Sequence, residues 1–409
     1  MSFATAPTSF QLPAWPVFES DECASVEQVL RSGRVNYWTG TACRDFERAW
    51  SDAHQGVHCL SMANGSLTMD AALRVLGIGP GDEVIVSPRS YVASAMCVAL
   101  CGATPVFADV DPESGCITLE TAEAVRSART KAIIPVHIGG WPCDMPKLCA
   151  WASQHGIQVI EDCAQSHGGH IDGRPLGTFG AFASWSFCQD KIMTTGGEGG
   201  MLATLDKDLW KQAWAYCQHG KDCDRSLTPA PAGSAPGFRW LVDHAGTNLR
   251  MTEMQAAIGL RQLAKLRSWS AARQRNSLIM QEALRTVPGL RVPETPAGHA
   301  HYRCVAFTAG DNAGQLRDHL LNHLHVAGIP AMHGSCSEIY RESFFQARGW
   351  TPRHAGRGRL DDDGRLLHAR ALGETSLTFL VHHTIDEATM RHYATSAAAC
   401  LKRASIMPP

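Results

Sequence analysis

Strand and helix patterns alternate along residues 68–204, and this alternation limits the folds open to the chain. The sequence predicts helices at residues 68–76, 91–100, 118–125 and 145–155. It predicts short apolar strands at residues 84–86, 105–108, 132–136, 159–160, 181–187 and 201–204. Helices between short apolar strands are typical of βαβ units, whose parallel strands are covered on both faces. We therefore predict an α/β fold with a mainly parallel sheet flanked by helices.

The composition changes in the second half of the chain. Residues 224–237 are rich in Pro, Gly, Ser and Ala, which predicts a loop. A helix follows from residue 252 to 266, with Thr252 as its cap. We place a domain boundary on this helix, so that residues 1–260 form a large domain and residues 261–409 a smaller α+β domain. Residues 348–366 are predicted to form a second surface loop.

Charge and cysteine usage exclude several classes of protein. Lys and Arg number 37 against 39 Asp and Glu, a net charge of −2, whereas nucleic-acid binding needs a basic surplus. The longest uncharged stretch, residues 90–108, is interrupted by Gly102 and Pro105, and residues 1–30 lack the positive charge of a secretory signal. Fifteen cysteines without a C-x-x-C pair indicate free thiols in a reducing compartment. We expect a cytoplasmic protein with neither a membrane nor a nucleic acid as partner.

Two further patterns are interpreted as structural. Residues 77–81 (GIGPG) follow a predicted helix and precede a strand, the reverse of the order in a dinucleotide-binding turn. His319 and His323 share a helix face, but no acidic or Cys ligand stands at a matching offset. The pair His382-His383 is interpreted in the same way. We predict no metal site.

Residues 160–200 carry the pattern that points to chemistry. Asp162 follows a buried strand, at the edge where open α/β sheets bind ligands. Lys191 follows the next strand and precedes the glycine-rich residues 194–200 (TTGGEGG). A pyridoxal phosphate site needs a lysine amine, a carboxylate for the ring nitrogen, and phosphate donors such as a helix N-terminus. The segment Asn64-Gly65-Ser66 supplies such a terminus, so these parts together predict a pyridoxal phosphate site.

The chain resembles the DegT/DnrJ-type family of pyridoxal-phosphate sugar aminotransferases, in the aspartate-aminotransferase superfamily (fold type I). Matching segments lie between residues 40 and 258. They are residues 46–47, 64–66, 91–94, 105–107, 135–137, 161–165, 186–187 with Lys191, 194–200 and 248–252. The resemblance implies a large domain with a mainly parallel seven-stranded sheet and a smaller C-terminal α+β domain.

The resemblance also implies roles for particular residues. Lys191 would carry the cofactor covalently and move the proton of the reaction, and Asp162 would pair with the pyridinium nitrogen. The remaining cofactor-binding positions are Gln165 at the ring hydroxyl, Tyr91 on the ring face, and Gly65, Ser66 and Ser186 at the phosphate. Asn248 would reach the phosphate of a neighbouring subunit, which implies a homodimer with shared sites. By its position, Asn248 could instead cap the helix predicted from residue 252.

The implied reaction is a transamination in amino-sugar biosynthesis, for a polysaccharide or an antibiotic. The donor would be glutamate or glutamine, and the acceptor a keto sugar carried on a nucleoside diphosphate. A cyclitol ketone of the inosose type is the alternative acceptor. A sugar dehydratase of the same fold is disfavoured, because such relatives carry His in place of Lys191, and a non-catalytic regulator is a third reading. From the residues alone, we expect both aldimine formation and desolvation to lower the pKa of Lys191 and suit it to proton transfer.

Overall fold

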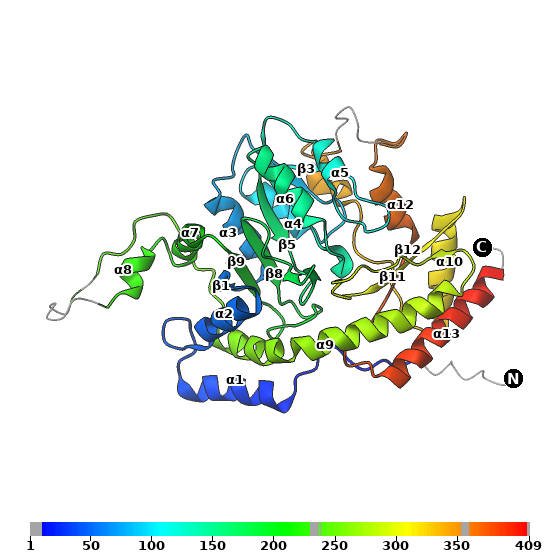
Figure 1. Ribbon diagram of the computed structural model, residues 1–409, viewed down its shortest axis with the longest axis horizontal. Coiled ribbons are helices and arrows are strands. Elements are labelled where there is room, and N and C mark those ends of the chain that lie inside the picture. Colours follow the sequence, from blue (N-terminus) through cyan, green and yellow to red (C-terminus); the bar gives the residue numbers. More distant parts are fainter. Residues whose placement is uncertain (1–9, 230–236, 238, 353–359, 407–409) are drawn as a thin grey trace.

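A central seven-stranded sheet organises the N-terminal two thirds of the chain (Figure 1). The computed structural model describes residues 10–229, 237, 239–352 and 360–406. The strands are β1 (His58–Met62), β2 (Glu83–Val86), β3 (Thr104–Phe107), β4 (Thr130–Ile134), β5 (Gln158–Asp162), β8 (Phe182–Ser186) and β9 (Gly200–Thr204). Their order is β1-β9-β8-β5-β4-β2-β3, parallel from β8 to β3. Only β9 runs antiparallel to its neighbours in this sheet, so the predicted mainly parallel sheet is confirmed.

Helices cover both faces of this sheet. They include α2 (Ala42–Ala53), α3 (Gly65–Val75), α4 (Ala93–Leu100), α5 (Leu119–Glu123), α6 (Met145–Gln154) and α7 (Lys207–Cys217). One apolar core joins β2, β3 and β4 to α3, α4 and α6, and a second joins β8 and β9 to α2. The helix predicted at 68–76 begins earlier, at Gly65, because the Asn64 side chain caps it by accepting a hydrogen bond from the Leu67 amide.

The longest helix, α9 (Glu253–Arg285), extends well past the helix predicted at 252–266. Thr252 caps it as predicted, in a capping box with Gln255. Figure 1 shows α9 running along the side of the sheet from α1 (Ser20–Ser32) and α2 toward α13 (Glu387–Ile406), and it contacts all three. Residue 260 lies within α9, and the domain boundary there stays a prediction.

The C-terminal part is a smaller α+β unit, as the sequence predicts. Its antiparallel sheet has the order β10 (Leu290–Arg291), β11 (Cys304–Thr308) and β12 (Ser376–Phe379). It packs with α10 (Ala313–Val326) and α13 around a third apolar core. The remaining elements are β6 (His170–Ile171), β7 (Arg174–Pro175), α8 (Cys223–Leu227), α11 (Ser343–Gln346), α12 (Leu367–Thr375) and two short 3-10 helices, Ile138–Gly140 and Ile339–Arg341.

The two predicted loops fall partly outside the described residues. The first, 224–237, begins within α8, so its first residues are helical because Asp222 caps that helix. Residues 230–236 of this loop, and 353–359 of the loop predicted at 348–366, lie outside the description. All fifteen cysteines are free thiols. Among the described residues, no helix is both long and apolar enough to span a bilayer.

Candidate active site

A cavity of about 500 Å³ opens where β5 and β8 end and α3 begins. Seven of the eight residues predicted to bind the cofactor line it: Gly65, Ser66, Tyr91, Asp162, Gln165, Ser186 and Lys191. The eighth, Asn248, does not line it. The cavity is within the size range of ordinary small-molecule sites. The fold therefore brings together side chains from segments more than a hundred residues apart.

Asp162 is held in a fixed orientation at the end of β5. Its side chain is buried, and Oδ2 accepts a hydrogen bond of 2.8 Å from Oγ of Ser94 on α4. Oδ1 accepts a bond of 3.1 Å from the amide of Ala164, and Ser94 is itself 2.8 Å from Oγ of Ser90. These bonds stabilise a carboxylate that would otherwise be costly to bury.

Lys191 lies beside an acidic and an aromatic side chain. Its Nζ is 3.6 Å from Oδ1 of Asp190 and 5.5 Å from the ring centre of Tyr302. The Tyr302 hydroxyl donates a hydrogen bond of 2.5 Å to Oδ2 of Asp190. The indole Nε1 of Trp15 donates to the main-chain oxygen of Lys191 at 2.9 Å. Lys191 thus contacts residues that are more than a hundred positions away in the sequence, on both sides.

The pKa of the free Lys191 amine is raised above its ordinary value. Burial opposes the positive charge, but the neighbouring Tyr302, Asp190, Asp162 and Cys188 together outweigh it. Desolvation therefore acts in the expected direction, but the net shift of the free amine is upward. Burial likewise raises the pKa of Asp190, but Lys191 and the Tyr302 hydrogen bond outweigh it, so the net shift is downward.

The other end of the cavity is shaped to receive an anion. Gly65 begins α3 next to Ser186, and a Cβ at position 65 would stand 2.7 Å from Cβ of Ser186. Ser184 fixes this contact, since its Oγ is 2.5 Å from Oγ of Thr68 and donates to the Gly65 oxygen at 3.3 Å. The amides at a helix N-terminus attract anions such as phosphate. Only a glycine at position 65 leaves room for this arrangement.

Three further predicted positions differ in how firmly they are held: Gln165 is buried, whereas Tyr91 and Asn248 are exposed. Gln165 accepts a hydrogen bond of 2.7 Å from the Gly139 amide through Oε1. Tyr91 precedes α4 instead of forming its first turn, and it is 70% exposed at the cavity wall. Asn248 is exposed, and its Oδ1 accepts from the Arg250 amide at 3.3 Å. The alternative that Asn248 caps α9 is wrong, because Thr252 occupies that position.

Three residues that position groups of this cavity were not predicted from the sequence: Ser94, Asp190 and Tyr302. Ser94 lies in the segment 91–94 that resembles the family, but Ser90 precedes α4, so no helical spacing links the two hydroxyls. Asp190 precedes Lys191 directly, but adjacency alone does not show that the two side chains meet. Tyr302 is 112 positions from Asp190, so no local pattern could pair them.

The side chains of His319 and His323 contact main-chain oxygens, and Nδ1 of His382 contacts Oγ1 of Thr384 at 2.7 Å. His323 Nδ1 is 2.9 Å from the oxygen of His319, and His319 Nε2 is 3.2 Å from the oxygen of Ala404. A buried group of His137, Glu161 and Cys163 also has its ligand atoms close together. The Glu161 oxygens, however, accept three amide hydrogen bonds, from residues 177, 179 and 180. This bonding explains the buried carboxylate without a metal.

The donor set fits pyridoxal phosphate. One cavity is lined by a lysine amine, a buried carboxylate and the N-terminus of α3, which begins at Gly65. A side chain at position 65 would fill the anion end of this cavity. When bound, the cofactor supplies an electron-withdrawing ring that stabilises negative charge on a substrate carbon. The sheet order, the smaller C-terminal unit and this cavity define a pyridoxal-phosphate-dependent transferase of fold type I.

Comparison with known proteins identifies the family. Residues 16–354 match the DegT/DnrJ/EryC1/StrS aminotransferase family, and the chain belongs to it. An aminotransferase from Psychrobacter cryohalolentis has a similar solved structure, with a TM-score of 0.88 and 43% identity over 95% of this chain and 98% of that one. The chain is accordingly a pyridoxal-phosphate-dependent aminotransferase.

Two relatives indicate the range of substrates in related enzymes. UDP-N-acetyl-3-dehydro-alpha-D-glucosamine 3-aminotransferase of Acidithiobacillus ferrooxidans is 38% identical over 66% of this chain and 68% of its own. L-glutamine:2-deoxy-scyllo-inosose aminotransferase of Streptomyces kanamyceticus is 36% identical over 72% of this chain and 70% of its own. By their names, one acts on a nucleotide-linked keto sugar and the other on a cyclitol ketone.

Proposed function

We propose that the chain moves an amino group from glutamate or glutamine to a keto sugar carried on a nucleoside diphosphate, in amino-sugar biosynthesis. The observation that carries the proposal is the meeting of Lys191, Asp162 and the α3 N-terminus in one cavity. The relative that acts on a UDP-linked keto sugar supports the acceptor class. The relative that uses 2-deoxy-scyllo-inosose keeps a cyclitol ketone as the second candidate.

In such a reaction, each residue of the cavity would bind a particular part of the cofactor or transfer a proton. We assign Asp162 to the protonated ring nitrogen of the cofactor, because an ionised partner stabilises that proton. Lys191 would bind the cofactor covalently and afterwards carry the proton as a general base and acid. Gly65, Ser66 and Ser186 would hold the phosphate, Gln165 the ring hydroxyl, and Tyr91 the ring face.

We infer a homodimer in which Asn248 of one subunit reaches the cofactor phosphate of the other. In the single chain, Asn248 is exposed and outside its own cavity. Nearby, Trp240 is 83% and Val242 61% exposed, and exposed apolar side chains of this size are common where proteins associate. Figure 1 shows α8 standing away from the central sheet, as a segment reaching for another subunit would.

The free thiols support a reducing compartment, and we place the enzyme in the cytoplasm.

Half-reactions test the proposed chemistry without knowledge of the natural acceptor. Glutamate or glutamine should convert the holoenzyme to its aminated cofactor form, seen as loss of the aldehyde absorbance. Keto-sugar nucleotides and inososes are then screened for return of that absorbance.

Borohydride reduction and peptide mapping should place the cofactor on Lys191, and Lys191→Ala should lose the label. A label on another lysine, with activity retained in Lys191→Ala, would contradict the assignment.

Subunit mixing tests the shared site. Lys191→Ala and Asn248→Asp homodimers should both be weak, the second because a carboxylate repels the phosphate. A mixed dimer collects both lesions in one site and leaves the other intact, so exchange should restore activity. Verified exchange without recovery, or an active monomer, would exclude the shared site.

A further inference from the structure

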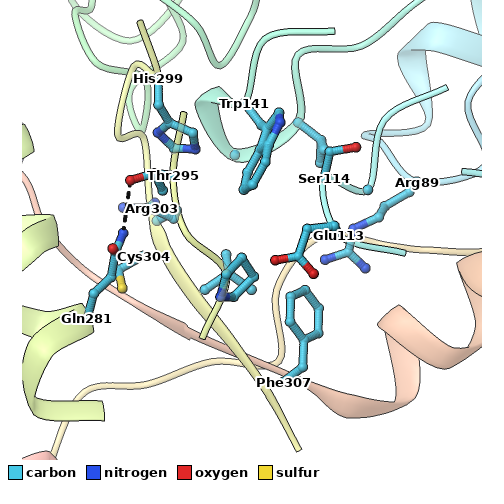
Figure 2. A pocket seen from close by; sticks show the side chains of 15 residues that line it. Arg89, Glu113, Ser114, Trp141, Gln281, Thr295, His299, Arg303, Cys304 and Phe307 are labelled. Carbon is cyan, nitrogen blue, oxygen red and sulfur yellow. Dashed lines mark hydrogen bonds between the residues drawn. The ribbon is translucent and has the colours of Figure 1, made fainter. Parts of the chain in front are cut away.

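A small cavity lies between loops of the large sheet and the C-terminal unit (Figure 2). Its volume is about 50 Å³, and Figure 2 shows Trp141 and Phe307 among the side chains that line it. Trp141 follows the 3-10 helix Ile138–Gly140, and Phe307 lies on β11. Protein interiors are close-packed, so a void of this size means that the two parts do not fit tightly here. Contacts elsewhere must therefore fix the C-terminal unit relative to the cofactor cavity.

One such contact is the N-terminal brace, our name for residues 10–15. These residues form no helix or strand, so their side chains and carbonyl groups hold them in place. Phe10 packs against the third apolar core, and its ring stacks on that of His392 with 5.0 Å between the ring centres. Near the other end, Oγ1 of Thr384 donates a hydrogen bond of 3.0 Å to the oxygen of Ala14. The brace is thus attached to the C-terminal unit at both ends.

Trp15, the last residue of the brace, reaches the turn that carries the active-site lysine. Its indole Nε1 donates a hydrogen bond of 2.9 Å to the main-chain oxygen of Lys191. The Lys191 amide donates to the oxygen of Cys188 at 3.1 Å, which closes the lysine turn, residues 188–191. The Lys191 main chain is therefore bonded on both of its sides, once within the turn and once to the brace. This fixes the point from which the Lys191 side chain extends toward Asp190.

Neighbours on α9 and in the C-terminal unit hold the Trp15 indole in turn. The indole meets Trp269 edge-on at 5.5 Å and His383 at 4.6 Å, and His383 stacks on Trp269 with 3.9 Å between the ring centres. The fully buried Arg273 places its guanidinium 6.0 Å from the Trp15 ring centre. Its Nη1 also donates to the main-chain oxygen of Tyr302 at 3.4 Å. Trp15 and Tyr302, which both contact the lysine turn, therefore share one support.

We propose that Trp15 is a positioning residue for Lys191, which acts through the main chain of the lysine turn. The family match begins at residue 16, and the resemblance gives Trp15 no role. A lysine that transfers a proton must hold its amine close to the reacting atoms, so a small shift of its main chain slows the reaction. This kinetic consequence rests on the proposed function, whereas the restraint on the lysine turn does not.

Hydrogen exchange of the full-length holoenzyme tests the restraint directly. Trp15→Phe keeps an aromatic ring and removes the indole donor. Loss of one such hydrogen bond should make the protected amides of residues 189–195 exchange about three- to tenfold faster, while those of β2 stay unchanged. Trp210→Phe is the matched control, because Trp210 Nε1 donates to a main-chain oxygen on β1, that of Cys59, at 2.8 Å. It loses the same kind of bond and should leave exchange of the lysine turn unchanged.

Single-turnover kinetics separate positioning from binding. Trp15→Phe should lower the rate of the first half-reaction at saturating donor about tenfold or more. The half-saturating donor concentration should change less than about twofold, because the indole binds the main chain and not the donor. If the wild-type enzyme accepts no donor, the proposed function fails, and the exchange comparison still decides the role of Trp15.

Thr384→Val guards against misfolding of Trp15→Phe. It removes the hydrogen bond to the oxygen of Ala14, next to Trp15, and should also accelerate exchange of the lysine turn. Exchange of residues 189–195 at the wild-type rate in Trp15→Phe, or in Thr384→Val should Trp15→Phe not fold, would overturn the proposal. Equal acceleration in Trp210→Phe would overturn it as well.

Discussion

The carboxylate of Asp190 lies 3.6 Å from the amine of Lys191, the next residue in the chain. Neighbouring side chains usually point apart in extended backbone, but here both face the same cavity. The contact makes Asp190 a positioning residue for Lys191: it favours the charged form of the amine and raises its pKa.

Asp190→Asn should therefore lower the pKa of Lys191. More of the amine is then neutral at a given pH, and cofactor should enter the apoenzyme faster below the wild-type midpoint. The rate of absorbance change on adding pyridoxal phosphate, measured against pH, gives this midpoint. Glu198→Gln is the control, an acid that lines the same cavity without an ion pair to Lys191. A midpoint that does not move would show that Asp190 has no electrostatic effect on the amine.

Ser94→Ala should weaken the enzyme through Asp162. The substitution removes the 2.8 Å hydrogen bond to Oδ2 and leaves the main-chain bond to Oδ1. A hydrogen bond to a charged group contributes about 1.5–3 kcal/mol, so the dissociation constant of the cofactor should rise about tenfold or more. Spectroscopic titration measures this constant. Ser94→Thr, which keeps the hydroxyl, should recover most of the affinity, and equal affinity in Ser94→Ala and wild type would contradict the role.

Gly65→Ala should cost cofactor affinity at the anion end. Its Cβ would stand 2.7 Å from Cβ of Ser186, so α3 or β8 must shift and the phosphate-binding amides move with them. Crowding of this kind costs about 1–3 kcal/mol, so we expect the dissociation constant to rise about five- to a hundredfold. Gly79→Ala is a matched control, because its nearest contact would be an ordinary 3.8 Å. Similar affinities for both variants would show that this close approach does not matter for binding.

Glu47 should make the stability of the protein depend on pH. Burial raises the pKa of this carboxyl from 4.5 to about 7, although Ser61 donates to it from both its amide and its hydroxyl. Below pH 4.5 the group is protonated in both states. Between about pH 4.5 and 7, Glu47 is ionised in the unfolded chain but still largely protonated in the folded protein. The free energy of unfolding therefore falls as the pH rises through this range.

Glu47→Gln removes this titration while keeping an acceptor for the Ser61 amide. Relative to wild type, its free energy of unfolding should gain on the order of 3 kcal/mol between pH 4.5 and 7, then stay level. Urea unfolding of the two proteins at several pH values measures the difference. Parallel pH curves would mean that Glu47 ionises normally in the folded protein.

The sequence predicts those parts of the fold whose signals are local. Apolar runs and turn residues mark β2 to β5, β8 and β9, and Thr252 marks the start of α9. Strand β1 is missed, because its residues mix polar and apolar types and form a strand by pairing with β9 at the sheet edge. The predicted helix 91–100 begins two residues before α4 does. The sequence pattern includes Tyr91 in this helix, but in the structure Tyr91 precedes α4 and is exposed at the cavity wall.

The cavity is predictable where its residues follow strand ends. Asp162 is placed by the rule that open sheets bind ligands at the carboxyl edge, whereas Ser186 is placed by the family resemblance. The pKa direction of Lys191 could not be predicted, because it depends on Tyr302, which reaches Asp190 from the C-terminal unit. Which side chains surround a buried charge is a tertiary property that local spacing does not contain.

The continuity of α9 sets a rule for recombining this enzyme with its relatives. Gln262 accepts a hydrogen bond from the amide of Thr194, Leu266 and Trp269 belong to the second core, and Met280 belongs to the third. A chimera joined at residue 260 would splice one parent's helix onto another parent's cores, with mismatched packing on both sides of the junction. Exchange of C-terminal units to alter acceptor preference should therefore carry the whole of α9 with one parent, and place the crossover after Arg285.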